Sequence, residues 1–282
     1  MALATKQDGR IHVESGLMRE SLVSKSLNES TESGSVRAMV PDVKFIAIGG
    51  QSIMDRGASA VLPLVEAIAG LNREGYKIIV GVGGGARARH TFSIGLDLGL
   101  PIGGLARIMG GVEEQNRDML QFLLAPHGGI TFVKDHLQDL QMFLNGGLIP
   151  VCIGQPPYHF YEPPPTRGAL PENGSDTGLF LMAELMGAEQ MIYVKDVDGL
   201  YREDPHVNPD ADFIAEATAA EIRDWALPDL PIERNLLDCV ENARLVKSIR
   251  LVNGLKPGSL AKAFAGEGVG SIIRSSRNRG AE

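Results

Sequence analysis

From residue 43 onward, short apolar runs alternate with longer stretches in which apolar residues recur at helical spacing. Val43–Ile48 and Lys77–Val82 are short, largely apolar runs, typical of strands that are buried on both faces. Between them, Ala58–Arg73 carries apolar residues three and four positions apart, which predicts an amphipathic helix. This alternation predicts an α/β fold with a mainly parallel sheet and helices on both of its faces.

The same alternation continues through the rest of the chain. It predicts further strands at 130–133, 148–153, 191–194, 249–252 and 270–273, and further helices at 86–98, 113–125, 137–144, 177–186, 236–246 and 259–265. In the helix at 113–125, Met119, Phe122 and Leu123 share one face. Between 197 and 235, Pro, Asp and Asn punctuate a segment rich in turns.

Residues 1–40 differ from the remainder in composition. They are polar, rich in serine and without Phe, Tyr or Trp, so they cannot bury a core of their own. Two interpretations stay open: a disordered tail, or an arm that packs on another subunit. The sequence thus predicts an arm at 1–40 and a single domain at 41–282.

Overall composition narrows the function classes. A net charge of -8 argues against nucleic-acid binding, which needs a basic surface. No apolar run approaches the roughly 18 residues that span a bilayer, and the N-terminus lacks the apolar core of a signal peptide. The two cysteines fit no metal-binding spacing, which suits a reducing compartment. We therefore expect a cytoplasmic protein with no membrane partner.

Two glycine-rich turns follow the first two strands. One contains Gly49 and Gly50, and the other contains Gly83, Gly84 and Gly85 and leads into a helix that carries Arg87 and Arg89. Ligands of open α/β sheets bind beyond the carboxyl ends of the strands, and backbone N–H groups of such turns converge on negative oxygens. Each turn alone is equally consistent with a structural role. Together with the arginines they predict an oxoanion site.

The segment after the strand at 191–194 offers the richest chemistry. Lys195 can neutralise phosphate oxygens, and Asp196 or Asp198 can hold Mg²⁺ or a ribose hydroxyl. Gly199 permits a sharp turn, and Tyr201 supplies a flat surface and a hydroxyl before Asp204 and Pro205. The alternative interpretation is an acidic turn at the end of a strand.

Three further positions are candidates with structural alternatives. Asp176 precedes an apolar helical stretch, where it either caps the helix or orients cationic groups around a phosphate. His159 and Glu162 lie in a loop stiffened by prolines and present one nitrogen and one oxygen ligand for a metal or metal oxide. His136 is a second metal candidate, although an exposed helix N-terminus explains it equally well.

These strings together resemble a known family. The order of Ile48–Gly50, Gly83–Gly85, Asp176–Gly178 and Val197–Tyr201 with Asp204–Pro205 resembles the amino-acid kinase superfamily, with UMP kinases as the nearest enzymatic branch. The strings Asp55–Gly57, Arg87–His90, Pro156–His159 and Val252–Leu255 with Pro257–Gly258 are similar to the subunits of the bacterial molybdenum storage proteins. The resemblance covers about residues 43 to 274.

The resemblance implies a three-layer αβα sandwich and a hexameric cage of related or identical subunits. It also implies binding of ATP with Mg²⁺, and storage of molybdate or tungstate as polynuclear oxide (polyoxometalate) clusters with nucleotide hydrolysis coupled to loading. Under it, His136, His159, Glu162 and Arg89 are cluster candidates, Asp176 is the organising residue, and the two turns and the 195–205 segment bind nucleotide. Molybdate is a tetrahedral oxoanion like phosphate, so backbone N–H groups and arginines suit both.

One departure from the family stands out. The family's first strand ends Lys-Ile-Gly-Gly, whereas this chain has Ala47 in place of the lysine. Such a lysine stabilises charge on the transferring phosphoryl group, and Lys44 lies on the opposite face of the strand. Three hypotheses therefore stay open: a storage subunit, a nucleoside monophosphate kinase, and a catalytically silent partner in a hetero-oligomer.

Overall fold

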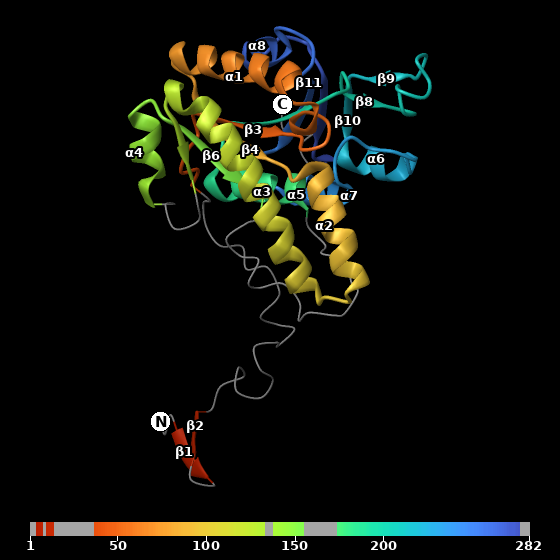
Figure 1. Cartoon of the computed structure of the whole chain (residues 1–282). Coiled ribbons are helices and arrows are strands. Elements are labelled where there is room, and N and C mark those ends of the chain that lie inside the picture. Colours follow the sequence, from red (N-terminus) through yellow and green to blue (C-terminus); the bar gives the residue numbers. More distant parts are fainter. Residues whose placement is uncertain (1–3, 8–9, 14–36, 133–137, 155–173, 277–282) are drawn as a thin grey trace. The chain divides into compact units, whose positions relative to one another are not determined.

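The computed structural model describes residues 4–7, 10–13, 37–132, 138–154 and 174–276. The chain divides into two units, Met1–Arg37 and Ala38–Glu282. In the first, β1 (Ala4–Gln7) and β2 (Arg10–Val13) form an antiparallel hairpin with Ala4 opposite Val13. The second unit holds every other described element (Figure 1).

An eight-stranded sheet forms the middle layer of the second unit, in the order β10-β12-β11-β7-β3-β4-β6-β5. Neighbouring strands are parallel except for β11 and β12, so the predicted mainly parallel sheet is confirmed. The strands are β3 (Val43–Ile48), β4 (Lys77–Val82), β5 (Gly129–Thr131), β6 (Ile149–Ile153), β7 (Gln190–Lys195), β10 (Glu216–Thr218), β11 (Ser248–Asn253) and β12 (Ser271–Arg274).

Helices cover both faces of this sheet, as predicted (Figure 1). One face packs on α1 (Ala58–Arg73), α3 (Ile102–Leu124) and α8 (Ser259–Phe264). The other packs on α4 (Leu140–Asn145), α5 (Ser175–Met186), α6 (Ala219–Trp225) and α7 (Arg234–Asn242). Strand β3 shows why two cores form: side chains alternate, so Phe45 and Ala47 face one core while Ile46 and Ile48 face the other.

Helix α3 is longer than predicted. It begins eleven residues before the predicted Glu113, at Ile102. Met119, Phe122 and Leu123 lie on its exposed side, whereas Leu120 is buried. The missed part, 102–112, contains four glycines, which have low helix propensity, and the buried stripe of the predicted part includes the polar side chains of Glu113, Asn116 and Arg117.

The segment that follows β7 contains elements that the sequence did not predict. Strands β8 (Leu200–Tyr201) and β9 (Phe213–Ile214) form a short antiparallel ribbon. Helix α6 begins with a capping box in which Thr218 and Glu221 exchange hydrogen bonds.

Three-residue 3₁₀ helices also occur at η3 (Met54–Arg56) and η4 (Ala125–His127). Among the described helices, none has the length and apolarity to cross a bilayer.

Candidate functional site

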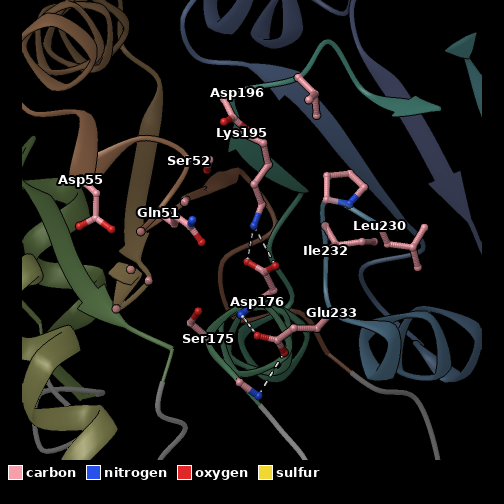
Figure 2. A pocket seen from close by; sticks show the side chains of 18 of the residues that line it. Gln51, Ser52, Asp55, Ser175, Asp176, Lys195, Asp196, Leu230, Ile232 and Glu233 are labelled. Carbon is pink, nitrogen blue, oxygen red and sulfur yellow. Dashed lines mark hydrogen bonds and ion pairs between the residues drawn. The ribbon is translucent and has the colours of Figure 1, made fainter. Parts of the chain in front are cut away.

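A cavity of about 920 Å³ opens at the carboxyl ends of β3, β4 and β7 (Figure 2). These strands are adjacent and parallel, so the residues that follow them meet at one edge of the sheet. The residues singled out in the sequence that line the cavity are Gly49, Gly50, Gly83, Gly84, Gly85, Arg89, Asp176, Lys195, Asp196, Gly199, Tyr201, Asp204 and Pro205. The cavity therefore brings together most of the described candidate residues.

The two glycine turns touch each other at the floor of this cavity. A Cβ on Gly50 would lie 2.2 Å from the backbone nitrogen of Gly85, and a Cβ on Gly49 would lie 2.0 Å from Ser52 Oγ. Gly85 also has a φ of +70°, in the left-handed region that disfavours side chains. The approach of the turns thus depends on the absence of side chains.

Helix α2 (Gly85–Asp97) begins at the second turn, and a carboxylate already faces its first turn. The Ala86 N–H donates to Asp55 Oδ2 at 2.6 Å. A Cβ on Gly85 would lie 2.6 Å from the same oxygen. Asp55 thus occupies part of the position where an oxoanion at this turn would lie.

Arg87 is directed away from the cavity, toward α3. Its guanidinium donates to Gln115 Oε1 at 3.0 Å and to Asn116 Oδ1, and it lies outside the cavity lining. Asn116 in turn donates to the Gly83 carbonyl at 2.7 Å. The described position of Arg87 therefore supports the turn from behind, and Arg89 is the arginine of this helix that lines the cavity.

A carboxylate from another segment of the chain also faces the first turn of α5 (Figure 2). Glu233 accepts hydrogen bonds from the backbone N–H groups of Gly174, Asp176 and Thr177, at 3.0 to 3.1 Å. The Thr177 hydroxyl donates to it at 2.6 Å. The N–H groups that a helix leaves unpaired at its beginning are therefore satisfied by a residue far along the chain.

Lys195 and Asp176 form an ion pair between β7 and α5. Lys195 Nζ lies 2.9 and 2.8 Å from the two carboxylate oxygens, and both side chains are largely buried. Tyr193, two residues earlier, donates its hydroxyl to the Asp176 carbonyl at 2.7 Å. This pair holds a cation beside the cavity at a fixed position.

The two aspartates after β7 have separate partners. Asp196 pairs with Arg56 at 2.7 Å and lines the cavity. Asp198 lies outside the lining and accepts hydrogen bonds from Asn253 and Lys256. Burial alone would raise the pKa of Asp198, but the hydrogen bonds from Lys256 and Asn253 outweigh burial and lower it. In the described structure Asp198 therefore stabilises the turn after β7 through its hydrogen bonds, and Asp196 faces the cavity.

The ribbon that follows carries the aromatic candidate. The rings of Tyr201 and Phe213 meet edge to face with centroids 5.3 Å apart. Beside them, the Arg202 guanidinium carbon lies 3.9 Å from the centre of the Trp225 ring. Tyr201 therefore reaches the cavity from a ribbon that is held by ring contacts.

Sequence reasoning missed several lining residues. Asp229–Glu233 forms one wall, with Leu230 and Ile232 as its apolar part (Figure 2). The proline-rich turn before α7 was the available signal, but nothing in its composition distinguishes a wall from a surface loop. Glu113 and Asp55 also line the cavity.

Glu113 is unusual because it is a buried carboxyl group in the middle of a helix. The residue is 2% exposed, and its Oε2 has no hydrogen-bond partner among the described residues. Burial, followed by the nearby charge of Glu233, raises its pKa to about 8. Glu113 is therefore predominantly neutral at pH 7.

His136, His159 and Glu162 lie outside the described residues, so their placement stays a prediction. Within the described ranges, no group of three or more His, Cys, Asp and Glu side chains is positioned to hold a metal ion. Ala47 is buried in β3 between Gly81 and Tyr193, on the face covered by α5.

Residues 42–237 match the amino acid kinase family. The chain is 40% identical over 264 residues to the molybdenum storage protein subunit beta of Azotobacter vinelandii, covering 94% of this chain and 97% of that one. It is 27% identical over 235 residues to the uridylate kinase of Hyperthermus butylicus, covering 81% and 96%.

Solved structures agree in fold. The UMP kinase of Bacillus anthracis superposes with a TM-score of 0.65 at 16% identity, covering 83% of this chain and 96% of that one. The uridylate kinase of Archaeoglobus fulgidus gives a TM-score of 0.62 at 18% identity, covering 82% and 99%. At such identities the likeness supports the fold alone.

Proposed function

Because this chain belongs to the amino acid kinase family, we propose that it is a subunit of a molybdate or tungstate storage cage and binds ATP with Mg²⁺ in the cavity described above. The observation that carries the proposal is the 40% identity with a molybdenum storage protein subunit across nearly the whole of both chains. Under the proposal, related or identical subunits assemble into a hexamer that encloses oxide clusters.

The nucleotide site draws its support from the geometry of the cavity. The glycine turns expose backbone N–H groups at the edge of the cavity because no side chains cover them, and Lys195 lies beside the same cavity. Leu230 and Ile232 offer an apolar wall for a base, opposite the lysine (Figure 2). A volume of about 920 Å³ is adequate for a nucleotide.

Mg²⁺ fits the donor set of the cavity only in part. Asp196 would contribute a carboxylate oxygen, and phosphate oxygens and water would supply the remaining ligands, as is usual for this ion. Bound there, Mg²⁺ would neutralise negative charge between phosphates. The chain's own contribution is to orient the phosphates on the turns and to place Lys195 and Arg56 around them.

The cargo chemistry follows the same principles. Arg89 lines the cavity and is suited to an oxoanion, while His136, His159 and Glu162 are proposed as the ligands on which an oxide cluster grows. Histidine nitrogen and carboxylate oxygen bind metal centres that backbone N–H groups do not. Oxoanion capture and cluster growth are thus assigned to different residues.

Elemental analysis of desalted protein tests the storage proposal. The protein is incubated with molybdate, with and without ATP and Mg²⁺, and its molybdenum content is measured. Many metal atoms per chain that depend on nucleotide support the proposal. A molybdenum content at the background level in both samples contradicts it, and a coupled assay with nucleoside monophosphates then tests the kinase hypothesis.

A second candidate is a catalytically silent subunit of a hetero-oligomer, and Ala47 favours it. The variant Ala47→Lys restores the missing amine, although the new side chain must extend past Tyr193 beneath α5. Faster ATP hydrolysis by this variant would support the hypothesis that the wild-type subunit is catalytically silent because it lacks the lysine. Unchanged hydrolysis in a variant that still binds ATP shows that the lysine is not what limits the reaction.

A further inference from the structure

Glu113 lies against the second glycine turn and has no part in the nucleotide site as proposed. A Cβ on Gly84 would lie 3.3 Å from Glu113 Cγ, so the side chain lies against the turn, and it also lines the cavity. The Gly154 N–H, at the end of β6, donates a hydrogen bond to its carboxyl group. Its Oε2 is inaccessible to water and has no partner among the described residues. A buried carboxyl oxygen in that state is costly unless a ligand or a proton completes it.

The charges around Glu113 favour its protonated form. Glu233 and Asp176 face it from the beginning of α7 and of α5, and both are acidic. Arg117, one turn along α3, directs its guanidinium to Asp118 at 2.8 and 2.9 Å. Cys152 on β6 is a neutral neighbour, because burial raises the pKa of its thiol to about 12. The described surroundings of Glu113 thus provide acidic groups and no dedicated cation.

We propose that Glu113 acts as a neutral carboxyl group that donates a hydrogen bond to an oxoanion held at the Gly83–Gly85 turn. An ionised carboxylate has only acceptor atoms and would repel a dianion, whereas the protonated group carries one O–H donor. The inference rests on the oxoanion binding proposed above and adds a proton requirement to it. Arg89, which lines the same cavity, would supply positive charge for the oxoanion, while Lys195 is already paired with Asp176.

A proton linkage follows from this arrangement. Below about pH 8, Glu113 already holds its proton, so binding of an oxoanion changes no protonation there. Above that pH, the free site has lost the proton, and binding must draw one H⁺ from solvent back to the carboxyl group. Affinity is therefore expected to fall by up to about tenfold for each further pH unit.

Titration calorimetry with molybdate tests this linkage, because molybdate itself does not change protonation in neutral or alkaline solution. Binding is measured at about pH 6.5 and about pH 9, in pairs of buffers that differ in ionisation enthalpy, which gives the number of protons taken up. The wild-type chain is expected to take up nearly one proton per molybdate at the higher pH and none at the lower one. The variant Glu113→Gln is expected to take up none at either pH and to lose the decline in affinity.

The neighbouring Glu114→Gln is the matched control, since it removes one carboxylate from the same helix at a less buried position and should behave as the wild type. Equal proton uptake by Glu113→Gln and the wild type, or no uptake by the wild type, overturns the inference. If Glu113→Gln does not fold, the wild-type measurement in paired buffers decides alone. Molybdate binding without proton uptake contradicts this inference only, whereas no binding under any condition contradicts the proposed function as well.

Discussion

The helices α2 and α5 begin at the same cavity, and a carboxylate from elsewhere in the chain faces the first turn of each. At α5, Glu233 accepts three backbone N–H groups and the Thr177 hydroxyl. At α2, Asp55 accepts one backbone N–H, from Ala86. Because the N–H groups of α5 are already satisfied, its first turn serves mainly to build the fold. At the first turn of α2 the facing carboxylate binds only one N–H group. This turn is therefore the better candidate for binding an oxoanion.

The largest expected effect concerns the pH dependence of stability near the α2 turn. The folded chain holds a proton on Glu113 that the unfolded chain releases above its ordinary pKa, so stability falls as pH rises from about 5 to about 8. The loss amounts to on the order of 4 kcal/mol. Urea denaturation across this range should show a shallower decline for Glu113→Gln than for the wild type. Parallel curves would contradict the buried, neutral state of this group.

The variant Gly50→Ala disrupts the contact between the two glycine turns. Its Cβ would lie 2.2 Å from the Gly85 nitrogen, so we expect a loss of about 3 kcal/mol together with loss of molybdate and ATP binding. Thermal unfolding and equilibrium binding measure the two effects. Gly111→Ala is the control, because it lies within α3 in open space and should be neutral or slightly stabilising. A Gly50→Ala variant with wild-type stability and wild-type binding of molybdate and ATP would show that the contact between the turns is not required.

The variant Glu233→Ala tests whether the first turn of α5 serves mainly to stabilise the fold. It leaves two N–H groups of α5 and the N–H of the preceding Gly174 without their acceptor, and we expect a loss of about 2 kcal/mol in the free energy of unfolding. The exposed Asp224→Ala on α6 is expected to change stability little. Should Glu233→Ala instead strengthen oxoanion binding while stability is unchanged, the assignment of the two helix ends would be reversed.

Asp55→Asn gives the smallest and most specific effect. It removes one negative charge from the α2 turn and weakens one hydrogen bond, so stability should fall by only about 0.5 kcal/mol. Molybdate should bind a few-fold more tightly, because it no longer competes with a carboxylate. Asp97→Asn, at the exposed carboxyl end of α2, controls for net charge. Equal gains from both variants would mean that Asp55 does not compete at the turn.

Much of the fold could be predicted from the periodicity of the chain. The strands Val43–Ile48 and Lys77–Val82 and the helix Ala58–Arg73 have the predicted bounds, because each strand is an almost uninterrupted apolar run and the helix keeps one amphipathic repeat along its length. The early part of α3 was missed, since four glycines between Ile102 and Val112 lower its helix propensity and interrupt its apolar pattern. The β8–β9 ribbon was missed because strands of two residues carry no period at all.

The site could be predicted best where it follows the strands. Gly49, Gly83 and Asp196 lie together because adjacent parallel strands end at one edge, which topology alone dictates. The roles of Glu233 and Asp55 depend on contacts between distant segments, and no local pattern specifies those contacts. The exclusion of Arg87 from the cavity has the same origin, because its partners belong to α3.

The contact between Arg202 and Trp225 provides a spectroscopic handle on the site. Trp225 is the only tryptophan of the chain, and the guanidinium over its ring belongs to the residue directly after Tyr201. Indole emission depends on nearby charge, so we expect a ligand that moves the Arg202 guanidinium relative to the ring to alter the fluorescence of this single chromophore. Nucleotide and oxoanion titrations can thus be followed in unlabelled protein, and their order of addition compared in real time.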